Sequence, residues 1–284
     1  MSAAAERFAR DGYLVVEGCF DPAAGASLLE RAADIVADFA ADMPARSVFT
    51  TDDQVRTSDA YFLDSGDRIS CFFEEEAFAD DGTLAVPIDR AINKIGHAQH
   101  DLDPVFDRFS RTDALADLAD ELGVGGHRLV QSMLIYKQPG IGGEVGAHTD
   151  HTFLWTEPAS VVGFWFALED ATLDNGCLWA LPGGHRRPVD RRFRRHPAGG
   201  TRMDTIGAPS ETAAEVTRTF TPLEAPAGTL AVLDGKLPHY SAANRSQRRR
   251  AAYTLHAIDP TARYPDDNWL QRPTLPLRGF RDRR

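Results

Sequence analysis

Apolar residues recur at helical spacing in about the first 125 residues and at strand-like spacing over most of the rest. In the first part, the pattern predicts a short helix over residues 2–10, a strand over residues 13–16 and a long helix that begins after Asp21. Another helix is expected from Pro104 to a stop at Gly123. The N-terminal part is therefore expected to be a mainly helical support.

Residues 46–86 show a less regular pattern. Two short strands are expected at residues 61–63 and 69–73, and the acidic residues 74–76 are expected to form a solvated edge. Lys94 lies in an apolar segment. On the residues alone, it is expected to be a surface lysine whose aliphatic stem lies along apolar neighbours.

From about residue 126 to residue 260, the chain is predicted to form short strands separated by turns rich in Gly, Asn and Asp. In the first of these strands, Gln131, Met133 and Ile135 share one face. Regularly spaced short strands are typical of a sandwich or a double-sheet barrel, so we predict a mainly β fold with supporting helices. The expected strands cover residues 129–137, 161–168, 177–181, 229–233 and 251–258, with two further segments around His148 and His239.

Length and composition favour one globular domain. The chain has 284 residues, of which 43% are hydrophobic and 26% charged, and it contains no linker rich in Ser or Gly. We therefore predict that residues 1–284 form a single domain that ends in an Arg-rich tail.

Charge and apolar runs limit the possible partners. A formal net charge of −11 disfavours general nucleic-acid binding. The start of the chain lacks the long apolar run of a signal peptide, and the run 161–168 is too short to span a membrane. Cys19, Cys71 and Cys177 lack C-x-x-C spacing and are expected to be buried free thiols. We therefore expect a cytoplasmic protein with no membrane span.

Residues 146–153 carry the most specific chemistry. His148 and Asp150 are two residues apart, and β-favouring and aromatic residues follow them. If the segment is extended, both side chains point to one face while Thr149 points away. They would then be two ligands of a metal site, and His239 is the best candidate for the third. Two His and one carboxylate are the ligand set of non-haem Fe(II) oxygenases.

The H-x-D motif alone is weak, because a solvated or capping His/Asp pair has the same sequence. Strand-like flanks, the distant His239 and an Arg downstream of it favour the metal site. His151 is expected to face away from Asp150, and His185 to have a structural role outside the ligand set. The remaining histidines lack partner spacing and are interpreted as ordinary: His97, His100, His127, His196 and His256.

Together, these motifs resemble the phytanoyl-CoA dioxygenase family, and within it the phytanoyl-CoA dioxygenase domain-containing proteins. The resemblance rests on His148-Thr149-Asp150, on residues 175–185, and on His239 with Arg250. It runs from about Phe8 to Pro276 and leaves only the terminal arginines outside. Further matching segments are residues 92–97, 130–133, 142–145 and 268–271.

The resemblance implies a double-stranded β-helix, which is a cupin-like jelly roll of two sheets with helices packed on one of them. It also implies an enzyme that holds Fe(II) through His148, Asp150 and His239 and uses 2-oxoglutarate and O2 as co-substrates. The implied reaction is hydroxylation of an aliphatic C–H in a small organic metabolite, with release of succinate and CO2.

The far carboxylate of 2-oxoglutarate needs a buried cation, and the planar fork of Arg suits a carboxylate. Arg250 matches the family position and opens an apolar strand, although the neighbouring Arg248 and Arg249 also fit a solvated run. The co-substrate residues that the resemblance implies are Arg250, Ser241, Lys94, Met133 and Trp165. For the last two, plain core packing is an equal alternative.

Other functions remain open. A halogenase would replace the carboxylate ligand with a small residue, so Asp150 favours hydroxylation. Desaturation, epimerisation or cyclisation would use the same cofactors. From other classes, a zinc hydrolase would suit the same ligands, but it would leave Arg250 and Ser241 without a role, and the chain has no H-E-x-x-H motif. A non-catalytic jelly-roll binding protein is the remaining alternative.

The substrate cannot be read from these residues. The family name suggests an acyl-CoA, but members that resemble this subgroup need not use one. Two basic stretches, 186–195 and 278–284, are expected to be a solvated loop and a disordered tail, with a rim for an anionic substrate as the alternative. A monomer and a homodimer both remain possible. Aromatic residues that could line the approach, or equally belong to the core, are Tyr61, Phe72, Phe73, Tyr136 and Trp155.

Overall fold

The computed structural model describes residues 2–42, 46–48, 59–207 and 219–283. Its helices are α1 (Ala3–Asp11), α2 (Pro22–Asp42), α3 (Ala60–Leu63), α4 (Ile88–Ala91), α5 (Gln99–Leu102), α6 (Pro104–Ser110), α7 (Asp113–Glu121) and α8 (Asp150–Phe153). Its strands are β1 (Tyr13–Val16), β2 (Ile69–Phe73), β3 (Ile92–His97), β4 (Arg128–Lys137), β5 (Val145–His148), β6 (Val162–Ala167), β7 (Leu178–Ala180), β8 (Arg191–Arg195), β9 (Thr201–Thr205), β10 (Thr221–Leu223), β11 (Leu230–Asp234), β12 (His239–Ser241), β13 (Arg250–Ile258) and β14 (Arg278–Gly279).

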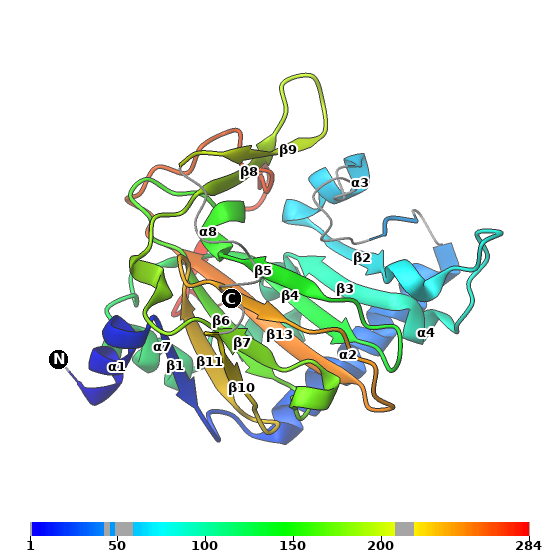
Figure 1. Cartoon of the computed structure of the whole chain (residues 1–284), viewed down its shortest axis with the longest axis horizontal. Helices are drawn as coiled ribbons and strands as arrows, with labels where there is room; N and C mark the ends of the chain where they lie inside the picture. The colour runs from blue at the N-terminus through cyan, green and yellow to red at the C-terminus, as the bar shows by residue number, and fades with distance from the viewer. Residues whose placement is uncertain (1, 43–45, 49–58, 208–218, 284) are drawn as a thin grey trace.

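Two antiparallel sheets form the body of the protein. Within the described residues, the larger sheet has the strand order β1-β11-β6-β13-β4-β3-β2, with β14 paired to β4, and the smaller sheet has the order β10-β7-β12-β5. Strands β8 and β9 form a separate hairpin that projects beyond both sheets (Figure 1). The predicted mainly β fold is confirmed, and it is a double-stranded β-helix with supporting helices.

The larger sheet is covered on both faces. On one face, Leu28 of α2 and Phe106 of α6 pack with Leu134 of β4 and Tyr253 of β13, and α2 lies behind the sheet in Figure 1. On the other face, residues such as Trp165 of β6 belong to a core shared with the smaller sheet. Because both faces are covered, β6 and β13 are buried at every position, and most of their residues are apolar.

The predicted strand at residues 61–63 is wrong, because this segment is helix α3. The side chain of Asp59 accepts a hydrogen bond from the backbone N–H of Phe62, at 2.8 Å, and so caps the helix start. The strand predicted at 69–73 is confirmed as β2.

The single helix expected from Pro104 to Gly123 is two helices, α6 and α7. Arg111 ends the first with a non-helical backbone, and the side chain of Thr112 accepts the N–H of Leu115 to cap the second. A helix-capping residue within the apolar pattern therefore separates it into two helices.

Two charged residues expected at the surface are buried. Glu74 is 2% exposed and accepts the N–H of Gly143 at 3.3 Å, and burial raises the pKa of its carboxyl. Lys94 is 3% exposed, and its Nζ lies 5.6 Å from the ring centroid of Phe62 and 5.1 Å from that of Phe72. Only the two neighbours Glu75 and Glu76 are exposed as expected.

The described C-terminal arginines, Arg278, Arg281 and Arg283, form ion pairs and do not form a disordered tail, and Arg284 lies outside the described residues. Arg278 contacts the buried Asp101 at 2.8 Å and Asp107 at 2.6 Å, and Arg281 contacts Asp117 and Asp120 on α7. These pairs attach the end of the chain to the helical layer, away from the site described below.

Cys71 and Cys177 are buried, Cys19 is partly buried, and all three are unpaired as expected. Among the described residues, no helix combines the length and the apolar character needed to cross a membrane. The single-domain organisation stays a prediction.

Candidate active site

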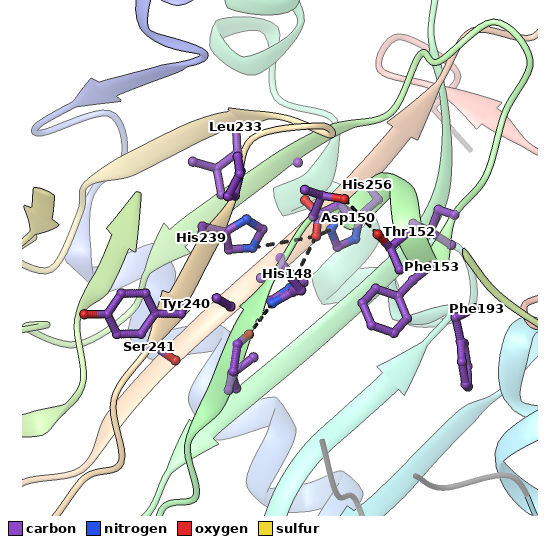
Figure 2. Close-up of a pocket in the computed structure, with 18 of the residues that line it drawn as sticks. His148, Asp150, Thr152, Phe153, Phe193, Leu233, His239, Tyr240, Ser241 and His256 are labelled. Atoms are coloured by element: carbon purple, nitrogen blue, oxygen red, sulfur yellow. Dashed lines mark hydrogen bonds and ion pairs between the residues drawn. The ribbon is translucent and has the colours of Figure 1, made fainter. Parts of the chain in front are cut away.

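His148, Asp150 and His239 converge at one end of the jelly roll. Nε2 of His148 lies 3.9 Å from Oδ1 of Asp150, and Nε2 of His239 lies 3.8 Å from the same oxygen. One donor atom from each residue lies within 4.8 Å of the other two. Figure 2 shows both imidazoles pointing toward the carboxylate. The three residues could therefore hold one metal ion.

The sheet register brings the two histidines together. His148 ends β5 and His239 begins β12, and the two residues are direct partners across this antiparallel pair. The segment is extended only through Thr149, and Asp150 is the first residue of α8. The expectation of one continuous strand is therefore wrong at its end, but the carboxylate still reaches the two imidazoles.

Backbone carbonyls orient both imidazoles. Nδ1 of His148 lies 2.8 Å from the carbonyl oxygen of Gly146, and Nδ1 of His239 lies 3.0 Å from that of Leu237. A carbonyl oxygen only accepts, so Nδ1 is the donor in each ring. In a neutral ring, Nε2 then carries the lone pair that a metal ligand needs, and in both residues Nε2 is the atom nearest Asp150.

Asp150 is 8% exposed. Burial alone would raise the pKa of its carboxyl, but the neighbouring imidazoles, first His256 and then His239, hold it well below its usual range. The carboxylate is therefore in the charged form that binds a cation.

A cavity of about 610 Å³ opens over these three residues. It is also lined by all five residues predicted as co-substrate contacts: Lys94, Met133, Trp165, Ser241 and Arg250. They come from strands β3, β4, β6, β12 and β13. The fold thus places in one cavity residues that are far apart in the sequence.

Arg250 is 2% exposed. Its Nε donates to the carbonyl of Gly176 at 3.2 Å, and its guanidinium carbon lies 5.7 Å from the ring centroid of Trp165. Among the described residues, its buried Nη1 has no hydrogen-bond partner. Burial lowers the pKa of Arg250 to about 10, so the side chain is a cation at neutral pH with a donor available for an anion.

The aromatic residues expected near the substrate do not line this cavity. The hydroxyl of Tyr61 accepts a hydrogen bond from the backbone N–H of Cys71 at 3.2 Å, and Phe73 packs on Phe39 in the helix-side core. Besides Trp165, the aromatic residues that line the cavity are Phe62, Phe153, Phe164, Phe193, Phe220, Tyr240 and Trp269. Which aromatic side chains line the cavity depends on how distant segments pack together, and the local sequence pattern does not show this.

The sequence did not predict a role for His256, because no other candidate ligand lies at a metal-binding spacing from it. It lines the cavity from β13, and its Nε2 lies 3.3 Å from Oδ1 of Asp150. By contrast, His151 packs against Trp155 with ring centroids 4.3 Å apart, and His185 contacts the carbonyl of Ala9. Neither of these two lines the cavity, in agreement with their predicted roles.

Half of the basic stretch 186–195 is strand β8, whereas residues 186–188 are exposed as expected. Arg187 and Arg191 line the cavity, whereas Arg192 and Arg194 form ion pairs with Asp267. Part of the stretch therefore lies at the cavity, and part holds β8 against the C-terminal segment.

A jelly roll that holds two His and one carboxylate inside one end defines the class of non-haem Fe(II) oxygenases. Within that class, the chain belongs to the phytanoyl-CoA dioxygenase family: the family model described as Phytanoyl-CoA dioxygenase (PhyH) matches residues 8–252. The family predicted from the sequence motifs is confirmed, and with it the prediction of an enzyme of the oxygenase type.

Relatives match along almost the whole chain. "Phytanoyl-CoA dioxygenase" of Arabidopsis thaliana is 42% identical over 95% of this chain and 93% of its own length. "Phytanoyl-CoA dioxygenase domain-containing protein 1" of Mus musculus is 40% identical over 96% and 95%. Among solved structures, EctD from S. alaskensis in its apoform has a TM-score of 0.65 and 25% identity, covering 99% of this chain and 86% of that one. The carbocyclase SnoK from nogalamycin biosynthesis, with a TM-score of 0.63, 16% identity and coverage of 94% and 87%, shares the fold.

Proposed function

We propose that this chain binds Fe(II) through His148, Asp150 and His239 and uses 2-oxoglutarate and O2 to hydroxylate an aliphatic C–H of a small organic metabolite. The observation that carries the proposal is the joint placement of this triad and the buried Arg250 in one cavity. A triad alone would suit several metals, but a triad beside a cation with an unused donor suits a metal-bound dicarboxylate.

The donor set fits Fe(II). Two imidazoles and one carboxylate are a ligand set that Fe(II) takes with positions left for other ligands, and the cavity over the three residues would give those ligands room. When bound, iron would supply the activation of O2 that converts 2-oxoglutarate to succinate and CO2 and inserts one oxygen atom into the substrate C–H bond. The protein residues supply the binding, orientation and shielding described next.

Arg250 would bind the far carboxylate of 2-oxoglutarate. Trp165 packs beside the guanidinium, and Ser241 lies two residues beyond His239 on β12, so its hydroxyl can donate to the same carboxylate. Lys94 and Met133 would complete the wall of this part of the cavity. A buried cation of this kind selects a dicarboxylate over a monocarboxylate, because the site pays a large penalty when the charge stays unpaired.

The substrate would enter between the aromatic residues that line the cavity. Apolar walls of this kind exclude water from the reacting centre. The presence of Asp150 favours hydroxylation over halogenation. Desaturation, epimerisation and cyclisation with the same cofactors are alternative outcomes, and identification of the product decides among them.

One experiment separates this proposal from a zinc hydrolase or a non-catalytic binding protein. The purified protein is mixed anaerobically with Fe(II) and 2-oxoglutarate, a weak visible charge-transfer band is recorded, and O2 is then admitted while succinate is measured. We expect the band and substrate-stimulated succinate release. Absence of both, with the protein folded and the metal present, would refute the proposal. A metabolite screen with the same succinate readout would identify the substrate.

We also propose that the protein is cytoplasmic and acts as a monomer or a homodimer. The three unpaired cysteines support a reducing compartment. Light scattering on the purified protein measures its mass and distinguishes the two oligomeric states, and fluorescence microscopy of the tagged chain tests the location.

A further inference from the structure

His256 contacts the carboxylate of the triad but lies outside the ligand set. Its Nε2 is 3.3 Å from Oδ1 of Asp150, which is closer than the triad imidazoles at 3.9 and 3.8 Å. The side chain is 7% exposed and lines the same cavity, and Figure 2 shows it beside the carboxylate. The buried imidazole of His256 therefore contacts Asp150, one of the three proposed metal ligands, directly.

The sheet provides room for this contact at one position. Gly163 of β6 is the direct partner of His256 in the antiparallel register of β6 and β13. A Cβ atom on residue 163 would lie 2.8 Å from Oδ2 of Asp150 and 3.6 Å from Cδ2 of the His256 ring. The missing side chain therefore makes space for the carboxylate and the imidazole together.

The hydrogen-bonding capacity of the two groups fixes the direction of the contact. An ionised carboxylate only accepts, so Nε2 of His256 must carry the proton. Among the described residues, the buried Nδ1 of His256 has no hydrogen-bond partner. In a neutral ring with its proton on Nε2, Nδ1 carries no proton, so no buried N–H donor is left without an acceptor.

We propose that His256 is a positioning residue of the metal centre, which donates from Nε2 to Asp150 and, with Gly163 behind the carboxylate, holds Oδ1 turned toward His148 and His239. Carboxylates that bind metals are commonly held by such outer partners, whose loss weakens metal binding about 10- to 100-fold. The proposal rests on the proposed function, because it assumes that Asp150 binds the metal.

The test measures metal binding without turnover. Co(II) is titrated into the apoprotein in the absence of 2-oxoglutarate, by calorimetry and by its visible absorption spectrum. We expect His256→Leu to weaken Co(II) binding roughly 10- to 100-fold and to change the spectrum, since the carboxylate is then free to rotate. His256→Gln keeps an N–H donor and should recover most of the affinity.

His185→Gln is the matched control, because His185 is also nearly buried but lies against α1, outside the cavity. It should bind Co(II) as the unaltered protein does. If His256→Leu does not fold, His256→Asn takes its place, since its amide is too short to reach Asp150. Unchanged affinity and spectrum in the variant would overturn the positioning role while the triad stands. If Asp150→Ala also binds Co(II) normally, the metal assignment itself fails.

Discussion

His148 and His239 lie directly opposite each other across the β5–β12 pair, with their ring centroids 4.3 Å apart. The pairing places both Nε2 atoms near one oxygen of Asp150, which follows the end of β5. Strand register therefore sets the separation of the two imidazoles, and the turn into α8 adds the carboxylate. The loss of any one of the three side chains should therefore disrupt the metal centre.

Replacement of any one of the three residues should abolish metal binding. His148→Ala, Asp150→Ala and His239→Ala each remove a third of a donor set whose atoms lie within 4.8 Å of one another. We expect loss of the anaerobic Fe(II)–2-oxoglutarate band and of succinate release, as chelation of the metal should also produce. His127→Ala is the control, since His127 contacts the carbonyl of Ser160 outside the cavity. A variant of the triad that retained the band would remove that residue from the ligand set.

Arg250→Ala should weaken 2-oxoglutarate binding while it leaves metal binding intact. Truncation of one partner of a buried charge pair costs about 2 kcal/mol or more, which is roughly thirtyfold in affinity. The apparent Kd for 2-oxoglutarate is measured by titration of the visible band. Arg249→Ala is the matched neighbour, because Arg249 is paired with Glu169 at 2.7 Å and is partly exposed. Equal effects of the two substitutions would contradict the role of Arg250.

The sequence was sufficient for the parts that depend on local pattern. The largely apolar segments of β6 and β13 predicted two strands. The spacing of His148 and Asp150, together with their strand-like flanks and the distant His239, predicted the group of three possible metal ligands. Asp150 begins a helix and does not lie on a strand. Its carboxylate still lies near His148 and His239, because the backbone is extended through Thr149.

The parts that failed depend on contacts between distant segments. The partners of Arg278 are Asp101 and Asp107, which lie 177 and 171 residues earlier in the chain, so the local sequence could not distinguish the tail from a solvated one. His256 reaches Asp150 only through the register of β13 with β6. Neither contact corresponds to a local sequence motif, whereas strands and helix caps do.

Lys137 should make stability depend on pH in the alkaline range. Burial, followed by the positive charge of Arg250, lowers its pKa from 10.5 to about 7 in the folded protein. Between these values the unfolded chain binds more protons than the folded one. The free energy of unfolding should therefore rise with pH from about 7 to 10, by at most about 1.4 kcal/mol per pH unit.

The measurement compares the unaltered protein with Lys137→Met in urea at several pH values. The difference in unfolding free energy between the two should grow as pH rises through this window, because the variant lacks the titrating group. Lys236→Met removes a lysine that is not buried and is the comparison for the loss of a lysine side chain. Parallel pH curves for the unaltered protein and Lys137→Met would show that the folded-state pKa is not lowered.

Arg278→Ala should destabilise the protein without affecting catalysis. It removes a partner of the buried Asp101, which costs about 1–3 kcal/mol for a buried group left short of a partner. Arg281→Ala removes exposed pairs with α7 and should change stability little. Thermal unfolding gives the stabilities, and succinate release at several salt concentrations should be unchanged in both variants. A changed salt dependence would instead assign the tail to substrate attraction.

Gly163→Ala should weaken the metal centre although residue 163 carries no side chain now. The added Cβ would lie 2.8 Å from Oδ2 of Asp150, closer than real Cβ contacts allow, so the carboxylate must move. We expect weaker Co(II) binding with an altered spectrum, measured in the absence of 2-oxoglutarate. Gly146→Ala is the matched control, because Gly146 also lines the cavity, on β5, and a Cβ there would meet nothing within 4 Å. If both alanines bind Co(II) equally well, the space at residue 163 does not set the position of the carboxylate.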